Sequence, residues 1–349
     1  MPLGAQDSFN VRVAGIGEVP VSNVAGVVLN VTATDTTAAS FVTVYPAGGS
    51  LPVVSNINFV PNQTIPNHVT VGVGTNGEIT VYNDAGSVDI IVDVVGYYVT
   101  GAGPTGAGYF PRFGTPRVVD TRAAAPIPPF GTFTLTIPGA SASGITAAVY
   151  NVTVDRPTAN GYITTYPYNT PRPDTSSINF TAGQASANLV TTKLGSSDGV
   201  TFFNGSGGTV HLIVDGIGLY TTSPNGHSYI VRPVPTGPFR LWDSRVQLSR
   251  PLDPHETFIV TGSALPVATT VGLLANLTVT QPSAGGYATV FPGASIQPPS
   301  SNLNFAPNET RANQVIPALL GSTTRDIAIY NDVGTAHYII DVFAYLQLD

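Results

Sequence analysis

The sequence contains no cysteine, and it has a single lysine (Lys193) and a single methionine (Met1) among 349 residues. The absence of cysteine excludes disulfides and thiolate metal sites. Only 9% of the residues are charged, and the arginines are scattered, so no basic patch exists to neutralise nucleic-acid phosphates. No stretch is apolar over the roughly 20 residues that a membrane-spanning helix needs. These absences argue against nucleic-acid binding and against membrane insertion.

The residues that are abundant are those of strands and turns. Hydrophobic residues make up 42% of the chain, and it carries 37 glycines and 30 prolines. β-branched side chains fit a pleated surface, whereas Gly, Pro and Asn form turns, and strong formers of surface helices are nearly absent. The composition therefore predicts an all-β protein.

One pattern occurs three times along the chain. Each copy has an Asn-x-Thr stretch, a second asparagine further on, and a closing aspartate within an apolar run. The corresponding residues are Asn30, Asn151 and Asn276, then Asn67, Asn188 and Asn313, and finally Asp93, Asp215 and Asp341. A period of about 120 residues is too long for a solenoid unit or a propeller blade and suits a whole domain.

Each copy contains about seven short apolar runs separated by turn residues, which is typical of a β-sandwich or barrel. We predict three tandem antiparallel β-sandwich-like modules: module 1 (1–104), module 2 (105–224) and module 3 (225–349). The stretches 100–108 and 221–228 are rich in Gly, Pro or Ser and are interpreted as linkers. A string of separate domains is expected rather than one stacked core. Such linkers allow both packing about a pseudo-threefold axis and an extended rod.

The motifs LNVT with TVYP, SNINF, Asn67-His68-Val69 and VDVVGYY resemble the tandem β-repeat modules of secreted and surface proteins of actinobacteria and related bacteria. Another motif of that repeat is a leading strand of the form RV-x-DTR, present at 117–122 and, in a drifted form, at 240–245. The resemblance covers nearly the whole chain. It implies an exported, β-rich accessory module, outside the cell or at its surface, without catalytic residues.

Module 1 is expected to lack the leading strand, because under the repeat spacing Met1 aligns with Arg122. Two explanations stay open: the module is cut short, or its strand comes from elsewhere. An open sheet edge is a template for pairing with another chain. Self-association is therefore one of the partner interactions that we expect.

The closing aspartates sit in apolar strands, where a carboxylate must be paired, hydrogen-bonded or exposed. The expected partner is the arginine that ends each leading strand, so we predict that Arg122 pairs with Asp215. In the same way Arg245 pairs with Asp341, and Asp93 is left without an arginine. A shifted pairing, Arg122 with Asp93 and Arg245 with Asp215, is the alternative. These bridges are expected to be structural, with a pH-sensitive latch as the functional alternative.

Motifs that suggest chemistry have simpler interpretations. The segment 195–199 matches G-x-S-x-G, but β-type residues follow it instead of a helix, so we expect a turn. His211 and His337 lie four residues before a closing aspartate, which is roughly 13 Å along a strand and too far to share a metal. The recurrent asparagines are interpreted as structural residues that bond to backbone. No nucleophile, acid–base pair or metal set has usable spacing, so we predict a non-enzyme without cofactor or metal.

Ligand contacts are expected in the loops that differ between copies, at 48–54, 168–175 and 293–299. Tyr168, Arg172 and the only tryptophan, Trp242, are the candidate ligand residues. The sequence thus predicts a non-catalytic extracellular scaffold, structural or adhesive, that can self-assemble. The alternative is a carbohydrate or cell-wall binding module that accompanies a secreted hydrolase, with a surface glycan as its partner.

Overall fold

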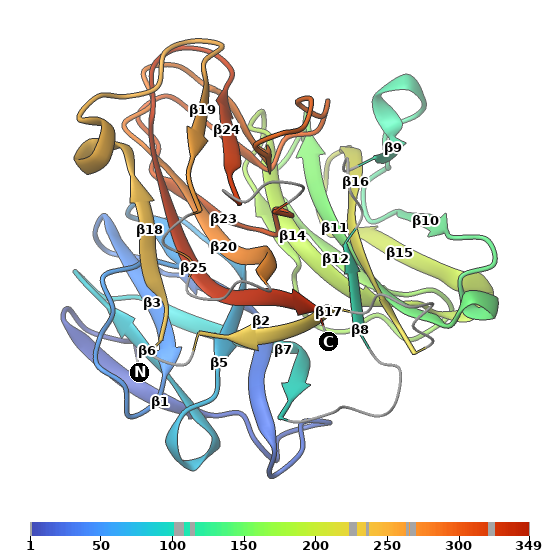
Figure 1. Cartoon of the computed structure of the whole chain (residues 1–349). Coiled ribbons are helices and arrows are strands. Elements are labelled where there is room, and N and C mark those ends of the chain that lie inside the picture. The colour runs from blue at the N-terminus through green and yellow to red at the C-terminus, as the bar shows by residue number, and fades with distance from the viewer. Residues whose placement is uncertain are drawn as a thin grey trace.

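A computed structural model describes residues 2–100, 108–111, 116–222, 229–234, 237–262, 265, 270–319 and 325–348. The fold is all-β, as predicted, and six small antiparallel sheets lie in a ring (Figure 1). Of the two predicted linkers, residues 101–107 and 223–228 lie outside the described residues.

Seven strands follow one another in the same order in each module, starting from β1, β10 and β19, and modules 2 and 3 have two further strands before them. Module 1 contains β1 (Asp7–Arg12), β2 (Val24–Thr34), β3 (Ser40–Pro46), β4 (Ile57–Phe59), β5 (Ile65–Gly72), η1 (Thr75–Gly77), β6 (Glu78–Asn83) and β7 (Asp89–Val99). Module 2 contains β8 (Gly108–Pro111), β9 (Arg117–Asp120), η2 (Thr121–Ala123), β10 (Thr132–Thr136), η3 (Ser141–Ser143), β11 (Ile145–Asp155), β12 (Gly161–Pro167), β13 (Ile178–Phe180), β14 (Ser186–Lys193), η4 (Ser196–Asp198), β15 (Gly199–Asn204) and β16 (His211–Thr221). Module 3 contains β17 (Tyr229–Pro233), β18 (Phe239–Asp243), η5 (Ser244–Leu248), β19 (Thr257–Val260), β20 (Thr270–Thr280), β21 (Gly286–Pro292), β22 (Leu303–Phe305), β23 (Arg311–Val315), β24 (Ile327–Asn331) and β25 (His337–Leu348).

Every module has one four-stranded sheet and one group of three further strands. The four-stranded sheets have the orders β1-β6-β3-β4, β10-β15-β12-β13 and β19-β24-β21-β22. The three-stranded groups are β5-β2-β7, β14-β11-β16 and β23-β20-β25, and the last two are joined through β8 and β17 into one ten-stranded sheet. Sheet pairing therefore continues from module 2 into module 3.

The long central hairpin of each module sets the position of its recurrent polar residues. In the antiparallel register, Asn30 lies opposite Asp93, Asn151 opposite Asp215, and Asn276 opposite Asp341. Because side chains alternate between the two faces of a strand, the apolar residues on either side of the asparagine face the module core. The asparagine and the aspartate share the opposite face, toward the neighbouring module.

The two sheets of a module pack around a core of its own. Residues of both sheets meet in each core; representative members are Leu29, Val44 and Ile79, then Val152, Ile163 and Phe202, and finally Leu277, Val290 and Ile329. A fourth buried cluster joins modules 2 and 3 and includes Tyr109, Leu189, Ile217, Leu274 and Leu346. The expectation of separate domains on a string is therefore wrong, because buried apolar surface and sheet pairing continue across the module boundaries.

The G-x-S-x-G segment is a turn, as predicted. Ser197 has a φ of 55° within the short turn η4, and strand β15 starts at Gly199. The Gly195 N–H donates to the Gly199 carbonyl at 2.8 Å, which closes a tight hairpin. No helix follows Ser197, so this serine does not sit on the strand–helix elbow of a hydrolase.

Candidate functional site at the module seams

The leading strands β9 and β18 lie along the outer edges of β16 and β25 (Figure 1). Arg117 is opposite Asp215 and Arg240 is opposite Asp341. Both pairings contain the same one-residue bulge, since the next matched residues are Val119 and, in module 3, Trp242. The two strands thus present their first arginine to the closing aspartate in one shared geometry.

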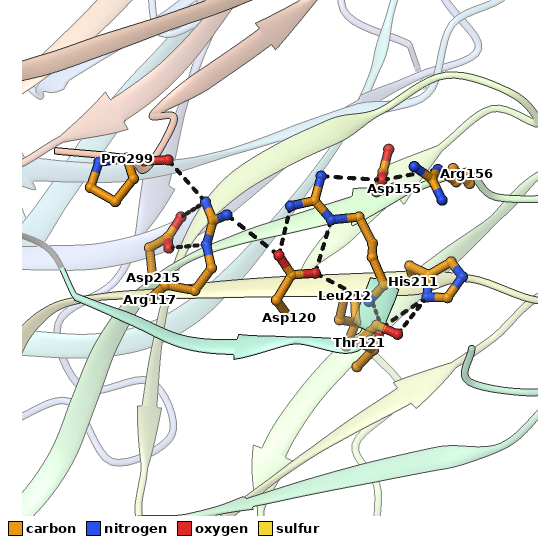
Figure 2. A network of polar contacts seen from close by, with 10 residues as sticks. Arg117, Asp120, Thr121, Asp155, Arg156, His211, Leu212, Asp215 and Pro299 are labelled. Carbon is orange, nitrogen blue, oxygen red and sulfur yellow. Dashed lines mark hydrogen bonds and ion pairs between the residues drawn. The ribbon is translucent and has the colours of Figure 1, made fainter. Parts of the chain in front are cut away.

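Arg117 holds Asp215 with two hydrogen bonds, from Nε to Oδ1 at 3.0 Å and from Nη2 to Oδ2 at 3.4 Å (Figure 2). The same Nη2 donates to the Pro299 carbonyl of module 3 at 3.3 Å. Burial raises the pKa of Asp215, and the hydrogen bond from Arg117 opposes that increase without cancelling it. Arg117 therefore both compensates a buried carboxylate and bridges the seam between modules 2 and 3.

Arg240 holds Asp341 in the same way, with Nε to Oδ1 at 2.9 Å and Nη2 to Oδ2 at 3.2 Å. The Asp341 side chain is fully buried. Its Oδ2 also accepts a hydrogen bond from the backbone N–H of Ser55, in module 1, at 3.4 Å. The second arginine–aspartate pair thus lies at the seam between modules 3 and 1.

The predicted pairings of Arg122 and Arg245 are wrong, and neither alternative register occurs. Arg122 contacts Asp120 at 2.6 Å, and its hydrogen bond holds the pKa of that carboxyl at about 2. Arg245 contacts Asp243 at the same distance. Both arginines follow the end of the strand and lie in a helical turn, where the preceding aspartate also accepts their backbone N–H. Only the first arginine of the motif remains on the strand and faces the neighbouring aspartate.

The surroundings of Asp93 differ from those of the other two aspartates. Among the described residues, none forms a hydrogen bond or an ion pair with its carboxylate, and none pairs with the outer edge of β7. Asp93 is only partly buried, and burial still raises its pKa. Ile91 is 49% exposed, whereas the matching Ile213 and Ile339 are 7% and 6% exposed. The open edge therefore leaves apolar surface in water.

A cavity of about 270 Å³ lies beside Asp93 at the seam between modules 1 and 2. Its walls include Ile91 from β7 and the segment 172–176 from module 2. Asp174 holds the place in that segment that Pro299 holds in the corresponding loop of module 3. A matching cavity of about 450 Å³ lies at the seam between modules 3 and 1, where Arg240 and Ile339 are among the residues that line it. Such a cavity is therefore present both with and without an arginine at the strand edge.

Buried asparagines join the three modules in a closed cycle. Asn30 donates to the Ser176 carbonyl at 2.7 Å, Asn151 to that of Ser301 at 2.6 Å, and Asn276 to that of Ser55 at 2.7 Å. Each bond crosses from one module to the next, and the third returns from module 3 to module 1. We name this set the asparagine ring, together with the second asparagines that donate back to it: Asn188 to Asn30, Asn313 to Asn151 and Asn67 to Asn276.

The residues that follow the second asparagines are His68, Leu189 and Gln314. Their backbone N–H groups donate to Asn188, Asn313 and Asn67 respectively, so these bonds also run around the cycle. The ring of His68 reaches both neighbouring modules, with Nδ1 3.2 Å from Gln314 Oε1 and Nε2 3.0 Å from Thr191 Oγ1. Burial lowers the pKa of His68 to about 4. The role of His68 was not predicted from the sequence, although the residue belongs to a recurrent motif.

The prediction that the recurrent asparagines bond to backbone is confirmed, and the structure adds that the backbone is that of the next module. We expect Asn188→Ala to lower the free energy of unfolding by about 1–3 kcal/mol, because it leaves buried partners on Asn30 and His68 without hydrogen bonds. Asn10→Ala, on exposed strand β1, is the matched control and should change it little. Denaturant unfolding measures both. Equal effects of the two substitutions would contradict a role of the asparagine ring in stability.

The three candidate ligand residues have different surroundings. Trp242 is 5% exposed and stacks on Phe258 at 5.0 Å, so it belongs to the core of module 3, and its assignment to a ligand loop is wrong. Tyr168 is 41% exposed at the start of its loop. The Arg172 guanidinium lies 3.9 Å from the centre of the Phe203 ring and lines the cavity beside Asp93. Tyr168 and Arg172 thus stay available for contacts.

Two histidines pair with hydroxyl groups in an arrangement that superficially resembles a nucleophile and its base. His337 Nδ1 lies 2.9 Å from Ser244 Oγ, and His211 Nδ1 lies 3.2 Å from Thr121 Oγ1. Ser244 is fully buried and its oxygen accepts the backbone N–H of Tyr338 at 3.0 Å. These contacts fix the start of β25 and of β16 against the leading strands.

Within the described ranges, no cluster of three or more His, Asp or Glu side chains is arranged to hold a metal ion. Among the same residues, no helix has the length and apolar character needed to cross a membrane.

The sequence missed Arg117 and Arg240 as the partners of the buried aspartates. The motif itself could have indicated them, because Arg117 and Arg240 are each its first residue. In an antiparallel pair, the neighbouring strand contacts residues along the whole strand and not only at its end. What the sequence does not show is the bulge, which sets the register of the remaining residues.

No family model matches this chain, and no curated protein matches it. Among solved structures, one reported as "The Triple Jelly Roll Fold and Turret Assembly in an Archaeal Virus" has a TM-score of 0.20 and 11% identity, covering 99% of this chain and 83% of that chain. Another, "Life in the extremes: atomic structure of Sulfolobus Turreted Icosahedral Virus", has the same TM-score and identity, covering 99% and 84%. A TM-score this low carries no argument about this chain.

Proposed function

We propose that the chain is a non-catalytic structural scaffold, in which three copies of one sandwich-like module are arranged about a pseudo-threefold axis. The observation that carries this proposal is the asparagine ring, which links each module to the next and the last to the first. Buried hydrogen bonds of this kind fix a unique arrangement, because breaking any of them leaves a polar group unsatisfied. The recurrent polar residues thus hold the three modules in one fixed arrangement.

The polar pairs outside the asparagine ring support the same proposal. Arg117 and Arg240 compensate buried carboxylates, and Ser244 and His337 attach a leading strand to β25. Each of these side chains has a structural partner in place. A scaffold makes use of all these contacts, whereas an enzyme needs groups that face an accessible reacting atom.

A location outside the cell or at its surface is part of the proposal. It rests on the resemblance to secreted and surface repeat modules of actinobacteria and related bacteria, together with the low charge of the chain. The proposed function of the scaffold at that location is adhesion or assembly. Strand β7 favours assembly, because none of the described strands pairs with its outer edge and Ile91, Val94 and Tyr97 are exposed. Such an edge is a template for another strand.

Light scattering across a concentration series tests the assembly function. We expect the molar mass to increase above 36.1 kDa as concentration rises, because exposed β7 edges of two copies can pair. The double variant Ile91→Lys/Tyr97→Lys should stay at the mass of the monomer. Ile296→Lys, at a residue that is 94% exposed in module 3, is the matched control and should behave like the original chain.

A chain that stays monomeric at every concentration would overturn the self-assembling scaffold. In that case the alternative of a carbohydrate or cell-wall binding module gains support. Glycan-array binding that Tyr168→Ala abolishes would favour that alternative, since Tyr168 is the exposed ring of its loop.

A further inference from the structure

We propose that the outer edge of β7 is a docking site for an extended segment of another polypeptide that carries the pattern Arg-x-apolar-Asp-Thr-Arg. The proposal rests on the non-catalytic scaffold and names a partner for its β7 edge, a partner that would compete there with a second copy of the chain. The partner is identified by chemistry alone: an extended backbone that pairs with β7, and a guanidinium that reaches Asp93.

The first observation is that this chain contains two occupied versions of the same site. Strand β9 pairs with β16, and β18 pairs with β25, each with an arginine opposite the closing aspartate and a bulge after it. In both versions the guanidinium makes two hydrogen bonds to one carboxylate. Strand β7 carries the same aspartate at the same register, opposite Asn30.

The second observation is the exposure of β7. Ile91 is 49% exposed and Val94 is 42% exposed, whereas their counterparts in module 3, Ile339 and Val342, lie opposite β18 and are 6% and 0% exposed. Burial of apolar area contributes roughly 25 cal/mol per Å². A strand placed on the edge of β7 would cover the apolar side chains there, as β18 does on β25 in module 3. It would also form hydrogen bonds with the backbone groups of the edge.

The third observation is the cavity beside Asp93. At the seam between modules 3 and 1 the matching cavity is bordered by Arg240, whereas here Asp93 itself is in the wall. The carboxylates of Asp93 and Asp174 both line it, which favours a cation. Arg172 lines it as well, but its charge is placed over the Phe203 ring. The cavity wall thus offers negative charge to an arginine side chain at the edge of β7, in the place where Arg240 borders the matching cavity.

These observations fix the register of the docked segment. By analogy with β9, its arginine lies opposite Asp93, its third residue opposite Val92, and its aspartate opposite Ile91. The arginine then donates two hydrogen bonds to Asp93, and its third contact is the carbonyl of Asp174. The segment runs antiparallel to β7.

The test uses a fluorescent peptide with the sequence of residues 116–123 (PRVVDTRA), titrated with the full chain at concentrations where light scattering shows a monomer. We expect saturable binding of one peptide per chain. Loss of the guanidinium in an Arg117→Ala peptide should weaken binding at least about tenfold, because hydrogen bonds to charged groups are strong. Asp93→Asn in the chain should weaken it to a similar degree. Asp89→Asn, on the same strand but outside the cavity wall, is the matched control and should leave binding unchanged.

Hydrogen exchange supplies a second readout that does not depend on affinity. Occupation of the edge should slow amide exchange along β7 and leave β16 and β25 unchanged. An affinity that neither Arg117→Ala in the peptide nor Asp93→Asn in the chain changes would overturn the proposal. Slower amide exchange at a strand other than β7 would also overturn it. A dimer of the chain that excludes the peptide would also overturn it, since a second copy would then be the occupant.

The two proposals fail in different ways. A chain that remains monomeric but binds the peptide refutes self-assembly and supports docking on β7. A chain that self-associates and never binds the peptide supports the assembling scaffold and refutes docking of this segment.

Discussion

We expect Arg240→Ala to lower the free energy of unfolding by about 3–5 kcal/mol at neutral pH, because it removes one partner of a buried ion pair. The Asp341 side chain is fully buried. Its carboxylate accepts two hydrogen bonds from Arg240 and one from the backbone N–H of Ser55. Without the guanidinium, the carboxylate must remain charged in the interior or take up a proton. Denaturant unfolding measures the loss.

A second substitution separates the uncompensated charge from the lost packing of Arg240. Asp341→Asn in the Arg240→Ala background should recover a large part of the stability, because a neutral amide needs no counter-ion. Arg122→Ala is the matched control: its partner Asp120 is part-exposed, and pairs of that kind contribute about 0–1 kcal/mol. If Asp341→Asn gives no recovery, the loss in Arg240→Ala does not come from the buried charge.

The second large effect is a loss of stability in acid through His68. Burial holds the pKa of His68 at about 4, against 6.5 for an ordinary histidine. The unfolded chain therefore binds the proton first, so stability is fully present above pH 6.5 and falls as the pH drops toward 4. The difference amounts to about 3 kcal/mol below pH 4. Protonation would also disturb the contacts of His68 with Gln314 and Thr191 in the two neighbouring modules.

His68→Leu isolates this effect, because module 2 has Leu189 at the matching position. Burial raises the pKa values of Asp93, Asp215 and Asp341, so their protonation favours the folded state and acts in the opposite direction. The quantity to measure is therefore the difference in unfolding free energy between the original chain and His68→Leu, followed from pH 7 to 4. Exposed His255, changed to glutamine, is the control. A difference that does not change with pH would refute the role of His68.

The sequence allowed good prediction of features that are local or periodic. The all-β class follows from composition, and the turn at Ser197 follows from the β-type residues after it. Each of these depends on neighbours along the chain or on comparison between copies.

Features that depend on packing between distant segments were not predictable in the same way. The pairing of Arg117 with Asp215 depends on a bulge that no residue type marks, so the sequence suggested Arg122 instead. The contact of His68 with Gln314 depends on how modules 1 and 3 meet, which the linkers leave open. Trp242 was assigned to a ligand loop because a lone aromatic is conspicuous, whereas its burial against Phe258 depends on the register of β18.

The cyclic order of the asparagine ring has a mechanical consequence. Modules 1 and 2 are consecutive in the chain, as are modules 2 and 3, so the polypeptide itself spans those two seams. The seam between modules 3 and 1 closes through non-covalent contacts alone, such as those of Asn276 and Asp341 with Ser55. Tension applied between the two outer modules is therefore borne first by that seam. The asparagine ring would open at that seam while each module stays folded. The closed form can therefore lengthen under tension without the unfolding of a module.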